Sequence, residues 1–209
     1  MDLAAWILNE INALDTALFW TIHLQLRTPF LDTIMPFFSH PYPFWKNIMI
    51  LISAGLLIFG GRRVRIAMIM LIIAVGLTDI ISSKILKEVF HRLRPYDALK
   101  GLTYHHVRSY AFPSSHAANS SAFATILFFR SRRLSYPFIG MACMVCYSRI
   151  YMGAHYPLDV LGGMILGVFM GTLVSKTETA IKTHLSSKTQ KVESENEIPA
   201  QSDIKEDNL

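Results

Sequence analysis

The chain has 209 residues, a length that suffices for one domain, and 52% of them are hydrophobic. The mean hydropathy is +0.34, and the apolar residues fall in long runs, which is typical of membrane helices rather than of a soluble domain. The formal net charge is +5, but the basic residues lie at the ends of apolar runs. They therefore indicate membrane topology, and we expect no nucleic acid partner. The first residues lack the basic segment and cleavage site of a signal peptide.

The first apolar segments are short and interrupted. Residues 3–14 are predicted to form a short amphipathic helix, and Asp15 or Thr16 could start a second helix that runs to about residue 26. Residues 27–29 interrupt the pattern with arginine and proline, and 30–38 resume it. Charged residues and proline oppose a continuous membrane span. Whether 16–39 crosses the bilayer therefore stays open.

Longer apolar segments follow, and they predict an all-α integral membrane protein built as a bundle of about six transmembrane helices. The predicted helices are 45–60, 64–90, 116–129, 134–150 and 157–175. A loop is expected over 91–113.

The end of the chain has a different composition from these helices. Residues 186–209 contain almost no large apolar side chains and are predicted to be disordered. The chain thus divides into an N-terminal amphipathic and first membrane segment (1–42), a helical core (43–177) and a polar tail (178–209).

Basic residues orient the bundle. Arginines cluster in the connections at 62–65 and 130–133, and Lys176 and Lys182 open the tail. These connections share one side if the spans alternate, and the positive-inside rule makes that side cytoplasmic. The tail is then cytoplasmic, and the opposite ends of the helices face outward.

Three polar stretches fall on that outward face. They are Lys87–Pro95 (KEVFHRLRP), Pro113–His116 (PSSH) and Ser148–Asp159 (SRIYMGAHYPLD). Together they supply three cations, two histidines, hydroxyl groups and a carboxylate. Cations and N–H donors stabilise the charge of a phosphoryl group in its transition state, so this set suits metal-free removal of phosphate.

Lys87, Arg94 and Arg149 are the candidate phosphate-binding cations. Lys87 and Arg94 are seven residues apart, two turns of one helix, and could share a face. The planar guanidinium of Arg149 suits phosphate oxygens. Each cation alone, like Lys84 or Arg92, could simply bind lipid headgroups. The accompanying histidines favour a phosphate site instead.

The second stretch supplies a helix start. Ser114, Ser115 and His116 follow Pro113, and free N–H groups at a helix N-terminus form an anion site. Either serine could also act as the N-cap. His116, in the first turn, could donate a proton to the leaving oxygen.

His155 and Asp159 form the third candidate group. Their i, i+4 spacing lets the carboxylate bond one imidazole nitrogen and leaves the other free to attack phosphorus. The alternative is a helix-start aspartate near an unrelated histidine. His105 and His106 lie in the outer loop, but no partner has metal-ligand spacing. We therefore predict no metal and no cofactor.

Two further patterns are assigned to helix packing. Gly163, Gly167 and Gly171 form a stripe of small residues that lets membrane helices approach closely. The stripe could serve within the bundle or between the subunits of a homo-oligomer. Cys143 and Cys146 lie on one predicted helix without a second ligand pair, so we read them as packing residues.

The three stretches resemble the pattern of the type 2 phosphatidic acid phosphatase superfamily of membrane lipid phosphatases. That pattern is matched in full by Lys87-(six residues)-Arg94-Pro95 and by Ser148-Arg149-(five)-His155-(three)-Asp159. The middle motif reads Pro113-Ser114-Ser115-His116, with serine where the family usually has glycine. The departure bears on local geometry, and Ser115 could add a hydroxyl contact.

The resemblance implies a six-helix fold with an extracytoplasmic active site and no metal. It implies that His155 is the nucleophile and forms a phosphohistidine, that Asp159 orients it, and that His116 is the general acid. The phosphate would be bound by Lys87, Arg94, Ser114, Ser115, His116 and Arg149.

The expected function is that of a bacterial inner-membrane lipid phosphatase or diphosphatase. Candidate substrates are undecaprenyl diphosphate, phosphatidylglycerol phosphate, phosphatidic acid and lipid A phosphate. The small size and short N-terminal region favour undecaprenyl diphosphate, by analogy with bacterial members. A sugar phosphatase is a lesser alternative. A non-catalytic protein that binds or transports phospholipid is the alternative from another class, although a binder has no need of an oriented histidine.

Overall fold

The structure is a computed structural model that describes residues 3–39, 43–99 and 109–197. Within these ranges every regular element is a helix. In chain order the elements are α1 (Leu3–Trp20), the π-helix η1 (Thr21–Gln25), α2 (Pro29–Ser39), α3 (Pro43–Phe59), α4 (Arg62–Ile80), the π-helix η2 (Ile81–Leu86), α5 (Lys87–Phe90), α6 (Pro95–Ala98), α7 (Ser115–Arg130), α8 (Arg132–Tyr151) and α9 (Pro157–Glu197). The all-α prediction is confirmed for the described residues.

Proline marks the start of four of these helices. Pro29, Pro43, Pro95 and Pro157 are the first residues of α2, α3, α6 and α9. A proline there loses nothing, because the N–H groups of the first turn have no partner within the helix. The fixed φ of the ring then defines where each helix begins.

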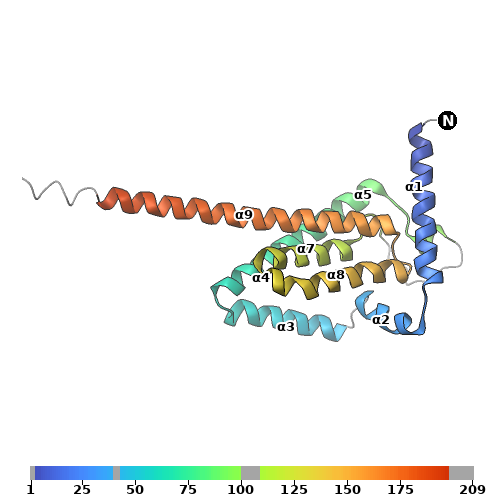
Figure 1. The fold of residues 1–209 in the computed structure, drawn as a ribbon, viewed down its shortest axis with the longest axis horizontal. Helices are drawn as coiled ribbons and strands as arrows, with labels where there is room; N and C mark the ends of the chain where they lie inside the picture. The colour runs from blue at the N-terminus through green and yellow to red at the C-terminus, as the bar shows by residue number, and fades with distance from the viewer. Residues whose placement is uncertain (1–2, 40–42, 100–108, 198–209) are drawn as a thin grey trace, which may run out of the picture.

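The body of the molecule is a bundle in which α4, α7, α8 and α9 lie side by side, with α3 along α4 (Figure 1). The central helix is α7, which packs against α9, α8 and α4. One buried cluster, including Phe19, Ala117 and Tyr156, fills one end of the bundle. A second cluster, around Met70 and Ile126, fills the other end.

The glycine stripe faces α7. A Cβ at Gly163 would lie 2.4 Å from the carbonyl oxygen of Ser114, and one at Gly167 would lie 2.1 Å from that of Ala118. The backbones of α7 and α9 therefore approach too closely for a side chain at these positions. The stripe serves packing within the chain, and association between copies stays a prediction.

The N-terminal segment differs from the prediction. Helix α1 runs unbroken to Trp20, so Asp15 does not start a second helix but lies buried within the first. The segment 16–39 is not one helix either, because η1 ends at Gln25 and α2 begins at Pro29. In Figure 1, α1 stands across one end of the bundle. Many of its large apolar side chains, such as Trp6 and Leu14, are exposed, whereas Phe19 is buried.

The tail also differs from the prediction. Disorder was expected from residue 186, but α9 continues through Glu197 and projects from the bundle as a single helix (Figure 1). Residues 198–209 lie outside the described residues. The polar composition of the tail fits a solvated helix as well as a disordered chain, and composition alone does not separate the two.

Two helical stretches, Arg62–Ala98 and Pro157–Glu193, are long and apolar enough to cross a membrane. The shorter apolar stretch Ile50–Phe59 lies in α3. Helix α7 is rich in alanine and serine, which lowers its hydropathy without preventing burial between neighbours. The count of about six spans stays a prediction.

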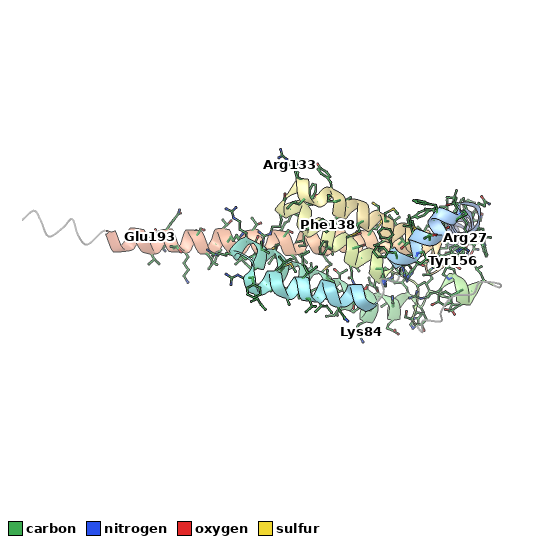
Figure 2. The ribbon with its side chains drawn as sticks, turned by 90° about the horizontal axis from the view of Figure 1, so that it is seen from below. Arg27, Lys84, Arg133, Phe138, Tyr156 and Glu193 are labelled. Atoms are coloured by element: carbon green, nitrogen blue, oxygen red, sulfur yellow. The ribbon has the colours of Figure 1, made fainter. Side chains whose placement is uncertain are left out.

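The three motif stretches meet at one end of the bundle. The first residues of α7 and α9 and the last residues of α8 lie beside α1, whereas the connections 60–61 and 130–132 lie at the other end (Figure 1). Figure 2 shows Tyr156 and Arg27 together at the motif end, with Arg133 toward the opposite end and Glu193 on the projecting helix. Alternating helices thus bring distant segments to one face, as predicted. Cys143 and Cys146 are free thiols on α8. Cys146 is buried in the core cluster, whereas Cys143 is exposed, so the assignment to packing holds for Cys146 alone.

Candidate active site

His155 lies in the connection between α8 and α9, and only 1% of it is exposed. Its backbone N–H donates to the carbonyl oxygen of Arg149 at 3.2 Å, which ties the connection to the end of α8. Arg94 Nη1 lies 3.4 Å from His155 Nε2. A guanidinium can only donate, so Nε2 accepts and the ring proton belongs on Nδ1. This tautomer puts the ring's lone pair on Nε2, which could act as a nucleophile once a phosphate oxygen replaces Nε2 as the acceptor of the Arg94 hydrogen bond.

The surroundings of His155 favour the neutral ring. Burial lowers its pKa well below the usual value, and the positive charges of Arg94, Arg149 and Lys87 lower the pKa further. A proton on this imidazole would be poorly solvated and would lie among like charges. The ring is therefore neutral at neutral pH, as nucleophilic attack requires.

Asp159 faces the other side of this imidazole. Its Oδ2 lies 3.7 Å from His155 Nδ1 and accepts the backbone N–H of Tyr156 at 2.9 Å. The predicted i, i+4 pairing is present as a close approach rather than a hydrogen bond. Catalytic hydrogen bonds often tighten only when substrate binds. Asp159 also stands in the first turn of α9, where a negative charge is favourable.

Lys87 and Arg94 do not share a helix, so the helical spacing argument was wrong. Helix α5 ends at Phe90, His91 adopts a left-handed conformation with φ 46°, and Arg94 is an extended residue before α6. Both cations are nevertheless buried, at 7% and 4% exposure. The turn, rather than a common helix face, brings Arg94 to His155.

Arg94 is held in place from two sides. Its Nε donates to the Ser109 carbonyl oxygen at 2.8 Å and its Nη2 donates to Ser109 Oγ at 2.7 Å. Its Nη1 reaches the Ala154 carbonyl oxygen at 3.3 Å. The guanidinium is thus fixed beside the nucleophile, which favours preorganised binding of an anion.

Arg149 reaches the site from the last turn of α8. It is 3% exposed, and its Nη1 donates to the carbonyl oxygen and the hydroxyl of Ser39 at 2.9 and 2.6 Å. The end of α2 thereby fixes the third cation. No pattern in the sequence predicts this contact between Ser39 and Arg149.

The PSSH stretch opens α7. Ser114 is the N-cap residue, but its hydroxyl makes no capping bond, and among the described residues this buried oxygen has no hydrogen-bond partner. The Ser114 N–H donates to the carbonyl oxygen of Asp159 at 2.9 Å, which joins the stretch to α9. An unpaired buried hydroxyl is costly, so a bound oxygen ligand would stabilise it.

Ser115 and His116 take different positions. Ser115 Oγ lies 3.0 Å from both Ser82 Oγ and Ser83 Oγ. Ser115 stands where the family usually has glycine, and its hydroxyl is therefore hydrogen-bonded to serines of η2. Its proposed contact with phosphate stays a prediction. His116 is exposed in the first turn of α7, and its function as a general acid stays a prediction.

Two further charged residues belong to this region. Arg92 Nη1 donates to Asp159 Oδ1 at 2.7 Å, and Arg92 Nη2 contacts Asp15 Oδ2 at 2.5 Å. From the sequence alone, Arg92 could simply bind lipid headgroups, and Asp15 or Thr16 could start a second helix. A carboxylate inside an apolar helix was the available signal for Asp15, because such residues are rarely placed without a function.

The described residues contain no group of three or more histidine, cysteine, aspartate or glutamate side chains that could hold a metal ion. His105 and His106, the residues considered for a metal site, lie outside the described residues.

Comparisons with known proteins agree with the motifs. The profile of the PAP2 superfamily matches residues 63–182, more than half of the chain. Undecaprenyl-diphosphatase BcrC of Bacillus subtilis is 29% identical over 161 residues, which cover 75% of this chain and 80% of the relative. Phosphatidylglycerophosphatase B of the same organism is 30% identical over 187 residues, or 83% and 88% of the two chains. A lipid A 4'-phosphatase of Bacteroides thetaiotaomicron is 29% identical over 71% of this chain and 70% of its own.

Two solved structures share the fold. The transmembrane PAP2-type phosphatidylglycerolphosphate phosphatase of Bacillus subtilis has a TM-score of 0.66 and 26% identity, covering 83% of this chain and 88% of its own. LpxE of Aquifex aeolicus has a TM-score of 0.63 and 26% identity, covering 78% and 95%. Both match the helical bundle described above.

Proposed function

We propose that this chain, which belongs to the PAP2 superfamily, is a membrane lipid phosphatase that works through a phosphohistidine on His155. Relatives named as phosphatases of three different lipids support the reaction class. One geometric observation carries the assignment of the nucleophile. Arg94 Nη1 lies 3.4 Å from His155 Nε2, so a phosphoryl oxygen bound by Arg94 would bring phosphorus within reach of the ring.

The proposed chemistry has two steps. In the first, His155 Nε2 forms a bond to phosphorus while the bond to the leaving oxygen breaks, and His116 protonates that oxygen. In the second, water attacks phosphorus and gives a proton to His116, the bond between phosphorus and Nε2 breaks, and inorganic phosphate leaves with both histidines restored. Lys87, Arg94 and Arg149, with Ser114, Ser115 and the N–H groups of α7, would stabilise the phosphoryl oxygens throughout.

The substrate we expect first is undecaprenyl diphosphate. The matched relatives include undecaprenyl-diphosphatases from bacteria and archaea. Phosphatidylglycerol phosphate, phosphatidic acid and lipid A phosphate are the competing substrates. A binding or transport protein is the alternative from another class, and a relative named as a bacitracin transport permease motivates testing it.

The deciding experiment measures phosphate release by the purified protein in detergent from each of these four lipids, beside His155→Ala. We expect release from at least one lipid, its loss by at least about 10³-fold in the variant, and retained lipid binding. Turnover that survives His155→Ala would show that the nucleophile is wrong. Lipid binding without release from any substrate would favour the binding or transport protein.

We also propose that the reaction needs no metal ion, because the buried cations Lys87, Arg94 and Arg149 supply positive charge at the site. Phosphate release should persist after incubation with EDTA and dialysis. Loss of activity that added Mg²⁺ or Zn²⁺ restores would contradict this proposal.

A further inference from the structure

Arg92 joins two buried carboxylates beside the candidate active site. It lies in the turn between α5 and α6, and its two terminal nitrogens contact Asp159 at 2.7 Å and Asp15 at 2.5 Å. Both carboxylate side chains are 0% exposed. The guanidinium also lies over the Tyr156 ring, 4.5 Å from its centroid. Arg92 is thus turned into the protein, and both terminal nitrogens are occupied by carboxylates rather than by lipid.

Asp15 is an exception on its helix. Most side chains of α1 are exposed, whereas Asp15 is buried. Its Oδ2 accepts from Arg92, and its Oδ1 accepts the backbone N–H of Leu158 at 2.9 Å. Burying an ion costs several kcal/mol unless it is well paired. Asp15 therefore has a defined geometry that ties α1 both to Arg92 and to the first turn of α9.

Arg92 and the backbone of Tyr156 hold the two oxygens of Asp159. Oδ1 accepts from Arg92, while Oδ2 accepts the Tyr156 N–H and lies 3.7 Å from His155 Nδ1. Without Arg92 the carboxylate would keep only the bond to Oδ2, and its terminal torsion has a broad minimum. Arg92 therefore completes the set of bonds that fixes the rotamer in which Asp159 faces the imidazole.

We propose that Arg92, itself held by Asp15, is the positioning residue that orients Asp159 toward His155. The inference rests on the proposed function of His155 as nucleophile. Through Asp15, the N-terminal helix α1 then helps to hold Arg92 and Asp159 in place. No residue of α1 is assigned a contact with phosphate.

The expected kinetic effect is on kcat, because Arg92 and Asp15 support the nucleophile rather than the bound phosphate. Arg92→Gln should lower kcat by up to about 100-fold, the cost of a small misplacement of a reacting group. Asp15→Asn removes the charge facing Arg92 but keeps an oxygen for the Leu158 N–H, so its loss should be smaller. The KM should stay within about twofold in both variants.

Two comparisons separate positioning from a general structural role. Arg92→Lys keeps the charge but offers a single ammonium for two carboxylates, so it should recover only part of the kcat lost in Arg92→Gln. Adding Asp15→Asn to Arg92→Gln should lower kcat no further, because Asp15 acts on Asp159 through Arg92.

Two matched controls come from the same region. Glu10→Gln neutralises an exposed carboxylate of α1, and Arg27→Gln breaks the exposed pair with Asp32. Both should leave kcat unchanged. Unfolding midpoints in detergent should be measured for every variant. If Arg92→Gln does not fold, the Asp15→Asn and Arg92→Lys variants decide the question by the same criteria.

Unchanged kcat in folded Asp15→Asn and Arg92 variants, with His155→Ala inactive, would overturn the inference and leave the proposed function intact. A raised KM at unchanged kcat would also overturn it, because Arg92 would then bind substrate. Activity that survives His155→Ala would instead overturn the proposed function itself.

Discussion

His155 is almost wholly buried, and the charged side chains that affect its titration most are cations. Water would normally solvate a protonated imidazole, but here the neighbouring groups are Arg94, Arg149 and Lys87. The same arrangement that would stabilise a bound phosphate therefore keeps the nucleophile unprotonated. Burial is the largest cause of the lowered pKa of His155, and the three cations that we propose bind phosphate lower that pKa further.

This environment predicts the acid limb of the pH profile. The pKa of His155 is lowered from 6.5 by burial and by the three cations, so the folded protein keeps the ring neutral until the pH falls below that value. The pH profile of kcat/KM should therefore show an acid limb below pH 6.5. An acid limb at or above that pH would contradict the assigned surroundings of the nucleophile.

The free energy of unfolding should also decrease as the pH is lowered. The unfolded chain takes up a proton on His155 near the ordinary pKa, whereas the folded chain resists it. The contribution of neutral His155 to stability is thus fully present above pH 6.5 and is lost as the pH falls through the folded pKa. Unfolding midpoints in detergent should decrease on acidification less in His155→Ala than in the parent protein. Equal decreases would contradict this linkage.

At the scale of single residues, motif spacing was enough to predict Lys87, Arg94, Arg149, His155 and Asp159 as one group. Spacing could not supply Ser39, Ser109 or Asp15, because these partners depend on contacts between segments that are distant in sequence. The serine that replaces glycine at position 115 shows the same limit. Its hydroxyl is hydrogen-bonded to Ser82 and Ser83 of η2, and no local sequence pattern predicts that contact.

Helices α7 and α9 approach so closely that their contact depends on the absence of side chains at the glycine stripe. A Cβ at Gly167 would lie 2.1 Å from the Ala118 carbonyl oxygen and 2.8 Å from the Ala122 nitrogen. Because these are backbone atoms, a rotamer change cannot relieve the clash. Since Ser114 is the N-cap of α7 and His116 lies in its first turn, a shift of this contact would also move the end of the helix that we propose binds phosphate.

Gly167→Ala should therefore destabilise the protein by about 1–3 kcal/mol, the cost of overpacking, and reduce phosphate release. Gly140→Ala is the matched control, because that glycine is also inside a helix but has nothing within 4 Å of an added Cβ. The control should be neutral or stabilised by about 0.5–1 kcal/mol. Thermal unfolding in detergent compares the two, and equal midpoints would show that the close approach is not required.

Helix boundaries were predicted well where a proline or a basic cluster lies at the end of the helix, as at Pro157. They were predicted poorly where contacts between distant segments determine the local conformation. The predicted helix end at residue 90 is confirmed, but no pattern in the sequence predicts the turn that follows it and places Arg94 beside His155. Helix α1 continues beyond Asp15, and that carboxylate is buried against Arg92, a contact that the apolar pattern does not predict.

The whole molecule has a motif end and a basic end, which implies an orientation in the membrane. Arg62, Arg130 and Arg133 belong to the basic end, and the positive-inside rule would place it in the cytoplasm. We propose that the active site faces outward and that the polar part of α9 is cytoplasmic, in a bacterial inner membrane.

Cysteine labelling tests this orientation. In a background with Cys143→Ala and Cys146→Ala, Glu88→Cys places an exposed thiol at the motif end and Lys188→Cys places one on the polar part of α9. A membrane-impermeant maleimide added to intact spheroplasts should label only Glu88→Cys. Labelling of both should require permeabilised membranes, and the reverse pattern would invert the proposed topology.

Helix α9 is one continuous element of 41 residues, Pro157–Glu197. At the α-helical rise it is about 60 Å long, roughly twice the thickness of a hydrocarbon core of about 30 Å. A domain fused rigidly in helical register after Glu197 would therefore be held away from the detergent belt at a fixed angle to the bundle. Such a fusion would give this small membrane protein an asymmetric landmark for aligning particle images in electron cryomicroscopy.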